Sequence, residues 1–473
     1  MSASEERHLA NQLGDYVEKL RYEDLPPEVV RKIKYHMLDT IGVSLYGAGM
    51  PWAKAVYDFV KDQGGAPQST VVVYGDKTSC TQAAFVNGTF AHSNDFDDNY
   101  AFGPLHPSAA FWTAIPLAER LGQGGRDVIL SASIGYDVTT RLAEACFSAA
   151  AGERTLTNRG FQGQAVCGTL GSAVQACKQL GLDSRTCASA LGIAGSYPGG
   201  TIEFLRDGTD TKRFHFGKAS QQGITSAMLA ANGFRGPQTI IEGHKGFLHA
   251  YSGEYDSSKV TEELGRRFDI MNVSLKKYPV MYGNETAIEA FLFLITQNKL
   301  KEEDVEEVEV DIRTMFVPYA MNYAGNIKEK LRPTTAFSAT MSVPYNLAVA
   351  MAFGDVRLEH WEDENRLLGD ERLARFAGKV KVNASEEFDK LSRKEAYIPS
   401  RVTIKTKDKR IFTETRVHPS GDPRNFMTED QVFAKFRDTA GRVLSPARLD
   451  PIIDNIMHLD TLRDIRELMR LLC

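Results

Sequence analysis

The sequence predicts a mainly α protein, with a large all-helical domain and a smaller α+β domain. Two observations carry this prediction. Apolar residues recur at helical spacing through the first part of the chain, in segments rich in Ala, Gly and Ser that let helices approach closely. After residue 270 the pattern changes, and short segments alternate between apolar and polar residues as strands do. The predicted boundaries are 1–268 for the helical domain, 269–418 for the α+β domain and 419–473 for a helical C-terminal segment that packs back on the helical domain.

The helical domain opens with a helix after Leu25. Prolines at 26 and 27 favour the first helical turn, Glu28 adds a negative charge at the positive end of the helix dipole, and Gly47 ends the helix. A short strand is predicted over Thr70–Tyr74. The other helices predicted in this domain span residues 81–92, 107–122, 126–149, 163–180, 183–195 and 217–232.

The α+β domain is predicted from three strand-like segments. Val305–Ile312 partly alternates, Val380–Val382 is a shorter candidate, and Arg401–Thr406 followed by Arg410–Thr415 has the pattern of a hairpin. The helices predicted between these strands span residues 284–298 and 337–353.

Composition excludes several classes of protein. The chain has 473 residues, of which 42% are hydrophobic and 25% charged, as in ordinary globular domains. A net charge of −5 argues against nucleic acid as a partner, and no apolar run approaches the roughly 18 residues of a membrane helix. Met1–Arg7 is polar and lacks the pattern of a signal peptide, so a cytoplasmic location is predicted, with an organelle left open.

Metal and nucleotide motifs are missing from the sequence. The six cysteines form no CxxC and no close cluster with histidine, which predicts reduced, buried thiols rather than zinc or iron–sulfur sites. Asp95-x-Asp97-x-Asn99 opens like a calcium loop, but Tyr100 stands where glycine is needed and His106 where glutamate is needed. There is no GxGxxG, Walker A, HExxH or GxSxG motif. No metal site is therefore predicted, and the simplest arguments for a nucleotide cofactor are removed.

The first candidate site runs from Ala91 to Ser108. Its acids and histidines stand between two apolar helices, so they are expected to point inward. Asp95 is an active-site carboxylate or a capping or ion-paired acid, while Asp97 and Asp98 are interpreted as structural. His106 precedes Pro107, a favoured first helical residue, which places its imidazole at a helix start where anions bind. It is a general acid or base, or a histidine that only caps the helix.

Two further segments add charge. Lys212, Arg213 and His215 precede a predicted helix and suit a ligand with two or more carboxylates; a solvated basic turn is the alternative, which the embedded Phe214 disfavours. The segment Lys276–Thr286 lies at the change of pattern and is expected to line an interdomain cleft. Its Glu285 is either catalytic or an ordinary first-turn acid.

Together these segments resemble the MmgE/PrpD family, which includes 2-methylcitrate dehydratase and cis-aconitate decarboxylase. The resemblance extends over nearly the whole chain. The motifs that carry it are Leu38-Asp39-Thr40-Ile41-Gly42, His92-Ser93-Asn94-Asp95-Phe96-Asp97-Asp98, His106-Pro107-Ser108, Thr211-Lys212-Arg213-Phe214-His215 with Gly217 and Ala219, and Ser342-Val343-Pro344-Tyr345.

The resemblance implies a large helical domain, a smaller α+β lid, a cleft between them, a homodimer and no cofactor. Family members dehydrate, decarboxylate or epimerise small polycarboxylates. Asp95, His106 and Lys212 match acidic, imidazole and ammonium positions of the family's site.

Three positions depart from the cis-aconitate decarboxylase pattern. Asn99 stands where that pattern has threonine, and Gln162 and Glu285 stand where it has histidines. Exchanging imidazoles for an amide and a carboxylate changes which groups can hold a proton. The segment Tyr278–Ala290 is closer to the dehydratase branch.

The sequence is therefore interpreted as a cofactor-independent lyase of the dehydratase type, acting on a small di- or tricarboxylate such as a 2-methylcitrate-like compound. The predicted catalytic residues are Asp95, His106, Lys212 and Glu285, and the predicted substrate-binding residues are Asn99, Gln162, Arg213, His215, Tyr278 and Tyr282. The alternatives are an epimerase or isomerase of a dicarboxylate, a cis-aconitate-type decarboxylase, and a non-catalytic carboxylate-binding protein.

Overall fold

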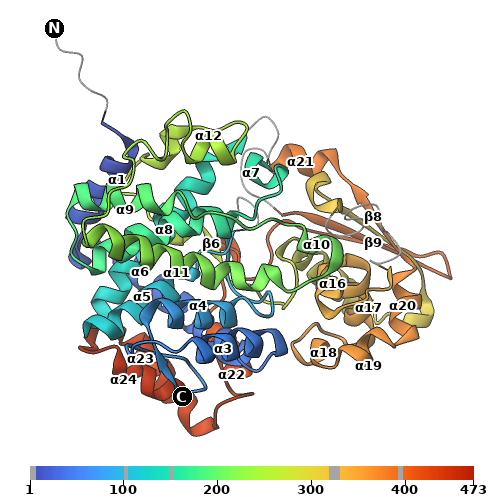
Figure 1. The fold of residues 1–473 in the computed structure, drawn as a ribbon. Coiled ribbons are helices and arrows are strands. Elements are labelled where there is room, and N and C mark those ends of the chain that lie inside the picture. The colour runs from blue at the N-terminus through green and yellow to red at the C-terminus, as the bar shows by residue number, and fades with distance from the viewer. Residues whose placement is uncertain (1–6, 101–104, 149–152, 319–330, 393–397) are drawn as a thin grey trace. The chain divides into compact units, whose positions relative to one another are not determined.

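The computed structural model describes residues 7–100, 105–148, 153–318, 331–392 and 398–473. Within these residues the chain is mainly helical, as predicted, with a few small sheets (Figure 1). Residue 149, where the helix predicted from 126 was to end, and the first six residues of the polar N-terminus lie outside the described residues. The chain divides into two compact units. The helical unit comprises Met1–Ile202, Asp210–Val273 and Met427–Cys473, and the mixed unit comprises Glu203–Thr209 and Ser274–Phe426.

The helical unit is built from helices joined by short connections. They are α1 (Leu9–Lys19), α2 (Pro27–Gly47), α3 (Pro51–Gln63), α4 (Cys80–Ala91), α5 (Ala109–Leu121), α6 (Gly125–Ala145), α7 (Thr155–Asn158), α8 (Gly163–Gln179), α9 (Ser184–Ala194), α11 (Thr211–Ala231), α12 (Phe247–Tyr251), α22 (Glu429–Ala440), α23 (Pro446–Met457) and α24 (Arg466–Met469). Six of them agree with predicted ranges to within four residues, namely α2, α4, α5, α6, α8 and α9.

Glycines allow α4 and α11 to cross at close range. A Cβ atom added to Gly88 would lie 2.6 Å from the Cα of Gly217, and one added to Gly217 would collide with the carbonyl oxygen of Phe85. Real Cβ atoms do not approach so closely, so both positions need glycine. This crossing brings the start of α11 against the end of α4.

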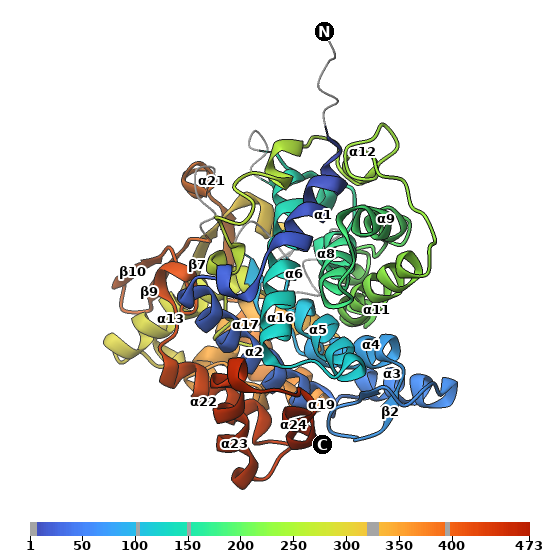
Figure 2. The same cartoon turned by 90° about the vertical axis from the view of Figure 1, so that its left-hand side faces the viewer.

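The C-terminal segment packs on α2. Helix α22 lies along α2 (Figure 2), and a Cβ on Gly42 would lie 2.5 Å from the Thr439 hydroxyl. Lys435 of α22 pairs with Asp39 of α2, and Lys34 of α2 pairs with Asp460. The segment thus belongs to the same compact unit as the N-terminal helices.

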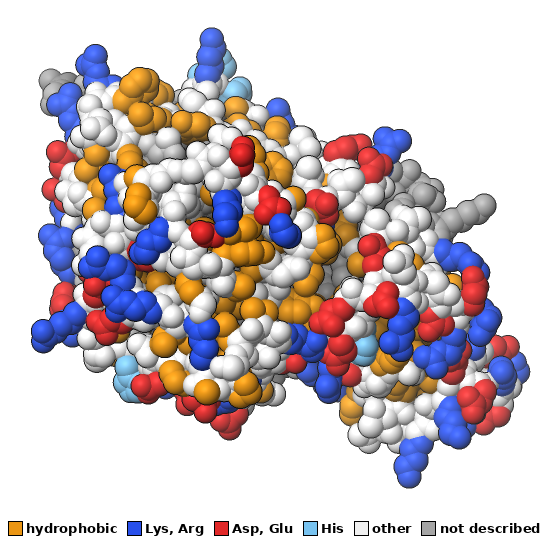
Figure 3. Space-filling model, turned by 60° about the horizontal axis from the view of Figure 1, so that its bottom comes forward, with side chains coloured by type: hydrophobic (Ala, Val, Ile, Leu, Met, Phe, Trp, Pro, Cys, Tyr) orange, Lys and Arg blue, Asp and Glu red, His pale blue; other side chains and the backbone are white. Residues whose placement is uncertain are grey.

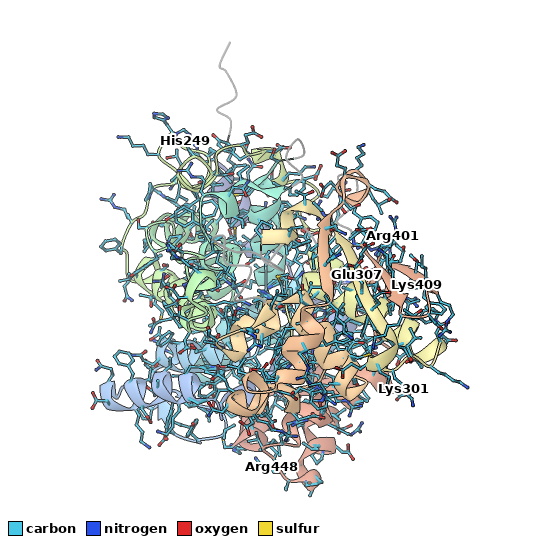
Figure 4. The ribbon with its side chains drawn as sticks, turned by 90° about the vertical axis from the view of Figure 1, so that its right-hand side faces the viewer. His249, Lys301, Glu307, Arg401, Lys409 and Arg448 are labelled. Atoms are coloured by element: carbon cyan, nitrogen blue, oxygen red, sulfur yellow. The ribbon has the colours of Figure 1, made fainter. Side chains whose placement is uncertain are left out.

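The mixed unit contains a four-stranded sheet with the order β10-β9-β7-β8. Its strands are β7 (Val305–Ile312), β8 (Val380–Ala384), β9 (Ser400–Thr406) and β10 (Ile411–Arg416). The predicted hairpin is confirmed, with Ile404 opposite Phe412 in an antiparallel pair. Alternate residues of β7 and β9 are buried. The intervening polar positions form ion pairs such as Lys405 with Glu307; Figure 4 labels Glu307 and Arg401 on the strands and Lys409 at the turn.

The helices of the mixed unit are mostly short. They are α10 (Phe204–Asp207), α13 (Glu285–Gln297), α16 (Ala336–Met341), α17 (Val343–Phe353), α18 (Glu359–Glu362), α19 (Glu364–Leu368), α20 (Glu371–Ala377) and α21 (Glu386–Ser392).

Three predicted elements differ from the structure. The helix 337–353 is broken at Ser342, whose hydroxyl accepts a hydrogen bond from the Tyr345 amide at 3.1 Å and caps α17, with Pro344 in the first turn. The strand Thr70–Tyr74 is reduced to β1 (Ser69–Thr70), because Val73 has a φ of 68° that ends the extended backbone. The helix predicted from residue 217 begins earlier, at Thr211.

The surface carries both signs of charge. Lys and Arg side chains are intermixed with Asp and Glu on the face drawn in Figure 3, beside apolar side chains. Among the described residues, no helix is both long and apolar enough to cross a membrane.

Candidate active site

The charged segment after α4 is buried. Helix α4 ends at Ala91, and the following His92, Asp95, Asp97 and Asp98 are each at most 6% exposed. Buried charges require partners, because leaving one unpaired in a low-dielectric interior is costly. The partners of these residues define the candidate site.

Asp95 forms an ion pair with Lys212. Lys212 Nζ lies 2.8 Å from Asp95 Oδ1, and both side chains are more than nine-tenths buried. Lys212 stands in the first turn of α11, so the basic residues lie within the helix rather than in a turn before it. Asp95 has a φ of 52°, a left-handed conformation that is uncommon for residues other than glycine. The two residues that the sequence assigned to one site are therefore brought together.

A second cluster lies close to Asp95 in the sequence and consists of His92, Asp97 and His106. His92 Nδ1 lies 3.0 Å from both carboxylate oxygens of Asp97, and His106 Nδ1 lies 3.3 Å from Asp97 Oδ2. The two imidazole rings are 4.7 Å apart, and His92 stacks on Phe216 of α11. The Asp97 carboxylate therefore contacts both imidazoles.

The position of His106 corrects one expectation. Helix α5 begins at Ala109 rather than at Pro107, so His106 lies three residues before the helix instead of directly before it. Its Nδ1 donates a hydrogen bond to the carbonyl oxygen of Asp98, because a carbonyl can only accept. The neutral ring then keeps its lone pair on Nε2.

These three residues also have the composition of a metal site. Their ligand atoms all lie within 4.8 Å of one another, and two histidines with one carboxylate suit zinc or iron. However, His106 Nδ1 donates to the Asp98 carbonyl, and His92 Nδ1 donates to Asp97. With both Nδ1 atoms protonated, a metal would bind through Nε2 of each imidazole, the same atoms that would take part in proton transfer.

His92 was named in the sequence motif but given no role. Since its Nδ1 carries the proton, its Nε2 is an acceptor, and this buried atom has no hydrogen-bond partner among the described residues. The sequence offered one indication of this contact, because His92 and Asp97 stand on either side of Asp95 in one short segment.

Asp98 belongs to a separate buried network. Its carboxyl group accepts from the Ser108 hydroxyl at 2.7 Å and from the Tyr136 hydroxyl at 2.7 Å. Burial and the neighbouring charge of Asp97 raise the pKa of Asp98 to about 8. His36 lies 3.4 Å away, and burial together with the charges of Lys32 and Lys435 holds its pKa well below the ordinary value. Asp98 and His36 are thus both neutral near pH 7.

The other basic residues of α11 have different partners. Arg213 pairs with Asp210, donates to the Ser93 carbonyl at 3.0 Å and lies 3.8 Å over the ring of Trp52. These contacts connect α11 to the segment that carries Asp95.

His215 donates from Nδ1 to the amide oxygen of Gln162, so two predicted binding residues are in contact. Burial and the charges of Lys218, His92 and Lys212 lower the pKa of His215 to about 3. His215 is therefore neutral and can offer a hydrogen bond rather than a charge. Asn99, a third predicted binding residue, is buried, and its amide donates to the carbonyl of Tyr100 at 3.0 Å.

The remaining predicted residues lie in the mixed unit. The fully buried Glu285 accepts a hydrogen bond from the Tyr278 amide at 3.1 Å. The Tyr282 hydroxyl lies 2.7 Å from the Ser274 hydroxyl and 3.3 Å from Asp422. Burial raises the pKa of both tyrosines, so both remain protonated at neutral pH. These residues form their own cluster at the start of α13.

Comparisons with known proteins match nearly the whole chain. Residues 11–259 match the model of the MmgE/PrpD N-terminal domain, and residues 278–459 match that of the MmgE/PrpD C-terminal domain. The cis-aconitate decarboxylase-like protein oryM of Aspergillus oryzae is 26% identical over 490 residues, covering 99% of this chain and 98% of its own. A cis-aconitate decarboxylase of Aspergillus terreus is 27% identical, over 98% of this chain and 96% of its own. The Homo sapiens cis-aconitate decarboxylase is 28% identical, over 96% of this chain and 92% of its own.

Proposed function

Because the chain belongs to the MmgE/PrpD family, we propose that it removes a hydroxyl group, as water, from a small di- or tricarboxylate such as a 2-methylcitrate-like compound. The family and the relatives indicate an enzyme of the lyase or decarboxylase kind. The observation that carries the finer proposal is the buried Asp95–Lys212 pair, which joins an ammonium group to a carboxylate in a segment rich in imidazoles.

The proposed reaction needs a base, an acid and a cation. The base takes a proton from the carbon next to a carboxylate, and the electron pair left behind forms a double bond as the hydroxyl on the neighbouring carbon leaves. The acid gives that hydroxyl a proton, so that it departs as water. Lys212 would stabilise the negative charge that grows on the substrate carboxylate, an effect that is strong at a preorganised, water-excluded site.

Two imidazoles are candidates for the base. His106 and His92 both have Nδ1 occupied by an acceptor, which leaves each neutral ring with a lone pair on Nε2. Asp97 fixes the tautomer and orientation of His92, as a carboxylate does in other base-orienting pairs. Asp95 is the alternative base, with Lys212 as its counter-ion.

Glu285 remains proposed as the opposing acid or base on the lid, with Tyr278 and Tyr282 as binding residues. Arg213, His215, Asn99 and Gln162 remain proposed as substrate-binding groups. A homodimer, an interdomain cleft, a cytoplasmic location and independence from a cofactor likewise stay predictions.

A second candidate is decarboxylation of a cis-aconitate-like acid. The relatives named as cis-aconitate decarboxylases, which match over at least 96% of this chain, favour it. The departures at Asn99, Gln162 and Glu285 argue against it, since an amide at 162 cannot carry the proton that an imidazole can.

The experiment is to incubate the purified protein with 2-methylcitrate, citrate and the aconitates. Growth of alkene absorbance would support dehydration, and release of bicarbonate would identify a decarboxylase. Deuterium uptake from heavy water without net loss of substrate would identify an epimerase. If the folded protein binds a tricarboxylate tightly but turns over none of the panel, and His106→Ala leaves that binding unchanged, the enzyme proposal is wrong.

A further inference from the structure

Lys435 reaches the candidate site from the far end of the sequence. It lies on α22, and its Nζ donates to the carbonyl oxygen of Phe96 at 2.9 Å. The same Nζ lies 2.6 Å from Asp39 Oδ1 of α2 and 3.9 Å from the centre of the Phe96 ring. A buried ammonium group is thus held by a carboxylate, a backbone carbonyl and an aromatic face, all within the helical unit.

The residue that Lys435 holds directly follows Asp95. Asp95 adopts a left-handed backbone conformation, which is uncommon for residues other than glycine and which aspartate adopts more readily than most. The Arg213 hydrogen bond to the Ser93 carbonyl secures the preceding side of this turn, and Lys435 secures the following side. Between these two anchors, the Asp95 carboxylate is directed at Lys212.

We propose that Lys435, held by Asp39, is a positioning residue that keeps the turn at Asp95 in the conformation needed for catalysis. The inference rests on the proposed function only in assigning Asp95 and Lys212 to the reaction. Helix α22, which contributes no predicted substrate contact, then supports the geometry of the site. Lys435 acts through the Phe96 carbonyl and is not itself expected to touch substrate.

The test separates positioning from simple loss of stability. Removing Lys435 alone would leave Asp39 buried without its cation, so the informative variant is the double substitution Lys435→Met with Asp39→Asn, which removes both charges together. The chain offers a matched control, because Lys34 of α2 donates to the Met457 carbonyl at 2.8 Å and pairs with Asp460. Lys34→Met with Asp460→Asn removes the same kinds of contact between α2 and the C-terminal segment.

Two readouts are compared at a temperature well below both unfolding midpoints. We expect the Lys435 and Asp39 variant to lower kcat at least 10-fold with KM changed less than 3-fold, while the control keeps kcat within 2-fold. The single variant Lys435→Arg, which keeps a positive charge opposite Asp39, should have a higher kcat than this double variant. Independently of activity, hydrogen exchange in a peptide covering residues 92–100 should be faster in the Lys435 and Asp39 variant than in the wild type or the control.

The outcomes distinguish this inference from the proposed function. Unchanged hydrogen exchange in residues 92–100 would overturn the positioning role, whatever the substrate is. Equal loss of kcat in both double variants would also overturn it, because the effect would then be one of general stability. A wild-type protein that is inactive on every acid in the panel, but whose exchange changes as expected, would reject the proposed function and retain the positioning of Asp95.

Discussion

Lys212 Nζ lies 2.8 Å from Asp95 Oδ1, and this ion pair is almost entirely enclosed. Breaking a buried pair by removing one partner costs about 3–5 kcal/mol, because the other charge is left uncompensated. Removing both charges avoids most of this cost. The contribution of this pair to stability and its proposed role in catalysis can therefore be measured separately.

We expect Lys212→Met to lower both the unfolding midpoint and kcat/KM, the latter by about 100-fold or more, as for loss of a group that stabilises transition-state charge. The double variant Lys212→Met with Asp95→Asn should regain much of the stability but none of the activity. Thermal unfolding and steady-state kinetics check this. Lys178→Met, which removes a lysine that donates to the Val17 carbonyl in the same unit, serves as the control. Activity in the double variant above one tenth of the wild type would contradict a catalytic role.

The orientation of His92 by Asp97 gives a second prediction. If the imidazole transfers a proton, His92→Asn should lower kcat by about 100-fold or more. Asp97→Asn should lower kcat too, because an amide no longer fixes the tautomer of His92. Far-ultraviolet circular dichroism controls for folding. A His92→Asn protein with normal kcat would leave His106 or Asp95 as the base.

Asp98 predicts a pH dependence of stability. The pKa of this carboxyl group is raised from 3.8 to about 8. Between these values the folded chain keeps a proton that the unfolded chain has released, so stability falls as pH rises through this window, by at most about 1.4 kcal/mol per pH unit. Asp98→Asn removes the titration, and its unfolding midpoint should depend less on pH between 5 and 8. The exposed Asp58→Asn is the control, and parallel pH profiles for wild type and Asp98→Asn would contradict the prediction.

The crossing of α4 and α11 gives a prediction about packing. Gly217→Ala would place a methyl group against the Phe85 carbonyl, and overpacking of this kind costs about 1–3 kcal/mol. Because α11 carries Lys212 and His215, we also expect a rise in KM for the substrate. Gly181→Ala, at a glycine with open space around it but a φ of 65°, should cost stability without changing KM. Denaturant titration and kinetics check both effects, and a Gly217→Ala variant as stable as the wild type would show that the helices can separate.

Local patterns predicted much of the fold. The hairpin of β9 and β10 and most helices of the first part of the chain follow from periodicity, because each needs only neighbouring residues to form. The break at Ser342 shows the limit. The segment is mostly apolar, so it was predicted as one helix although Ser342 can cap a new helix and Pro344 favours its first turn.

The site was predicted in part. The family resemblance assigns Asp95 and Lys212 to one site, and a buried carboxylate needs a nearby positive charge, so their proximity could be predicted. The roles of His92 and Lys435 depend on tertiary contacts, since nothing near Lys435 in the sequence indicates that its ammonium group meets the Phe96 carbonyl. The sequence predicts this helix only from residue 217, with Lys212, Arg213 and His215 before it, whereas the contact of α11 with α4, which accompanies the earlier start at Thr211, joins segments distant in the sequence.

The discontinuous helical unit has a consequence for biosynthesis. Residues 274–426, which supply most of the mixed unit, leave the ribosome before α22 does. The surface of α2 that α22 covers therefore stays exposed to chaperones until the mixed unit has been synthesised. The turn at Asp95 can be held by Lys435 only after residue 435 has emerged, so the chain gains its proposed catalytic geometry only after residues 274–426 have been synthesised.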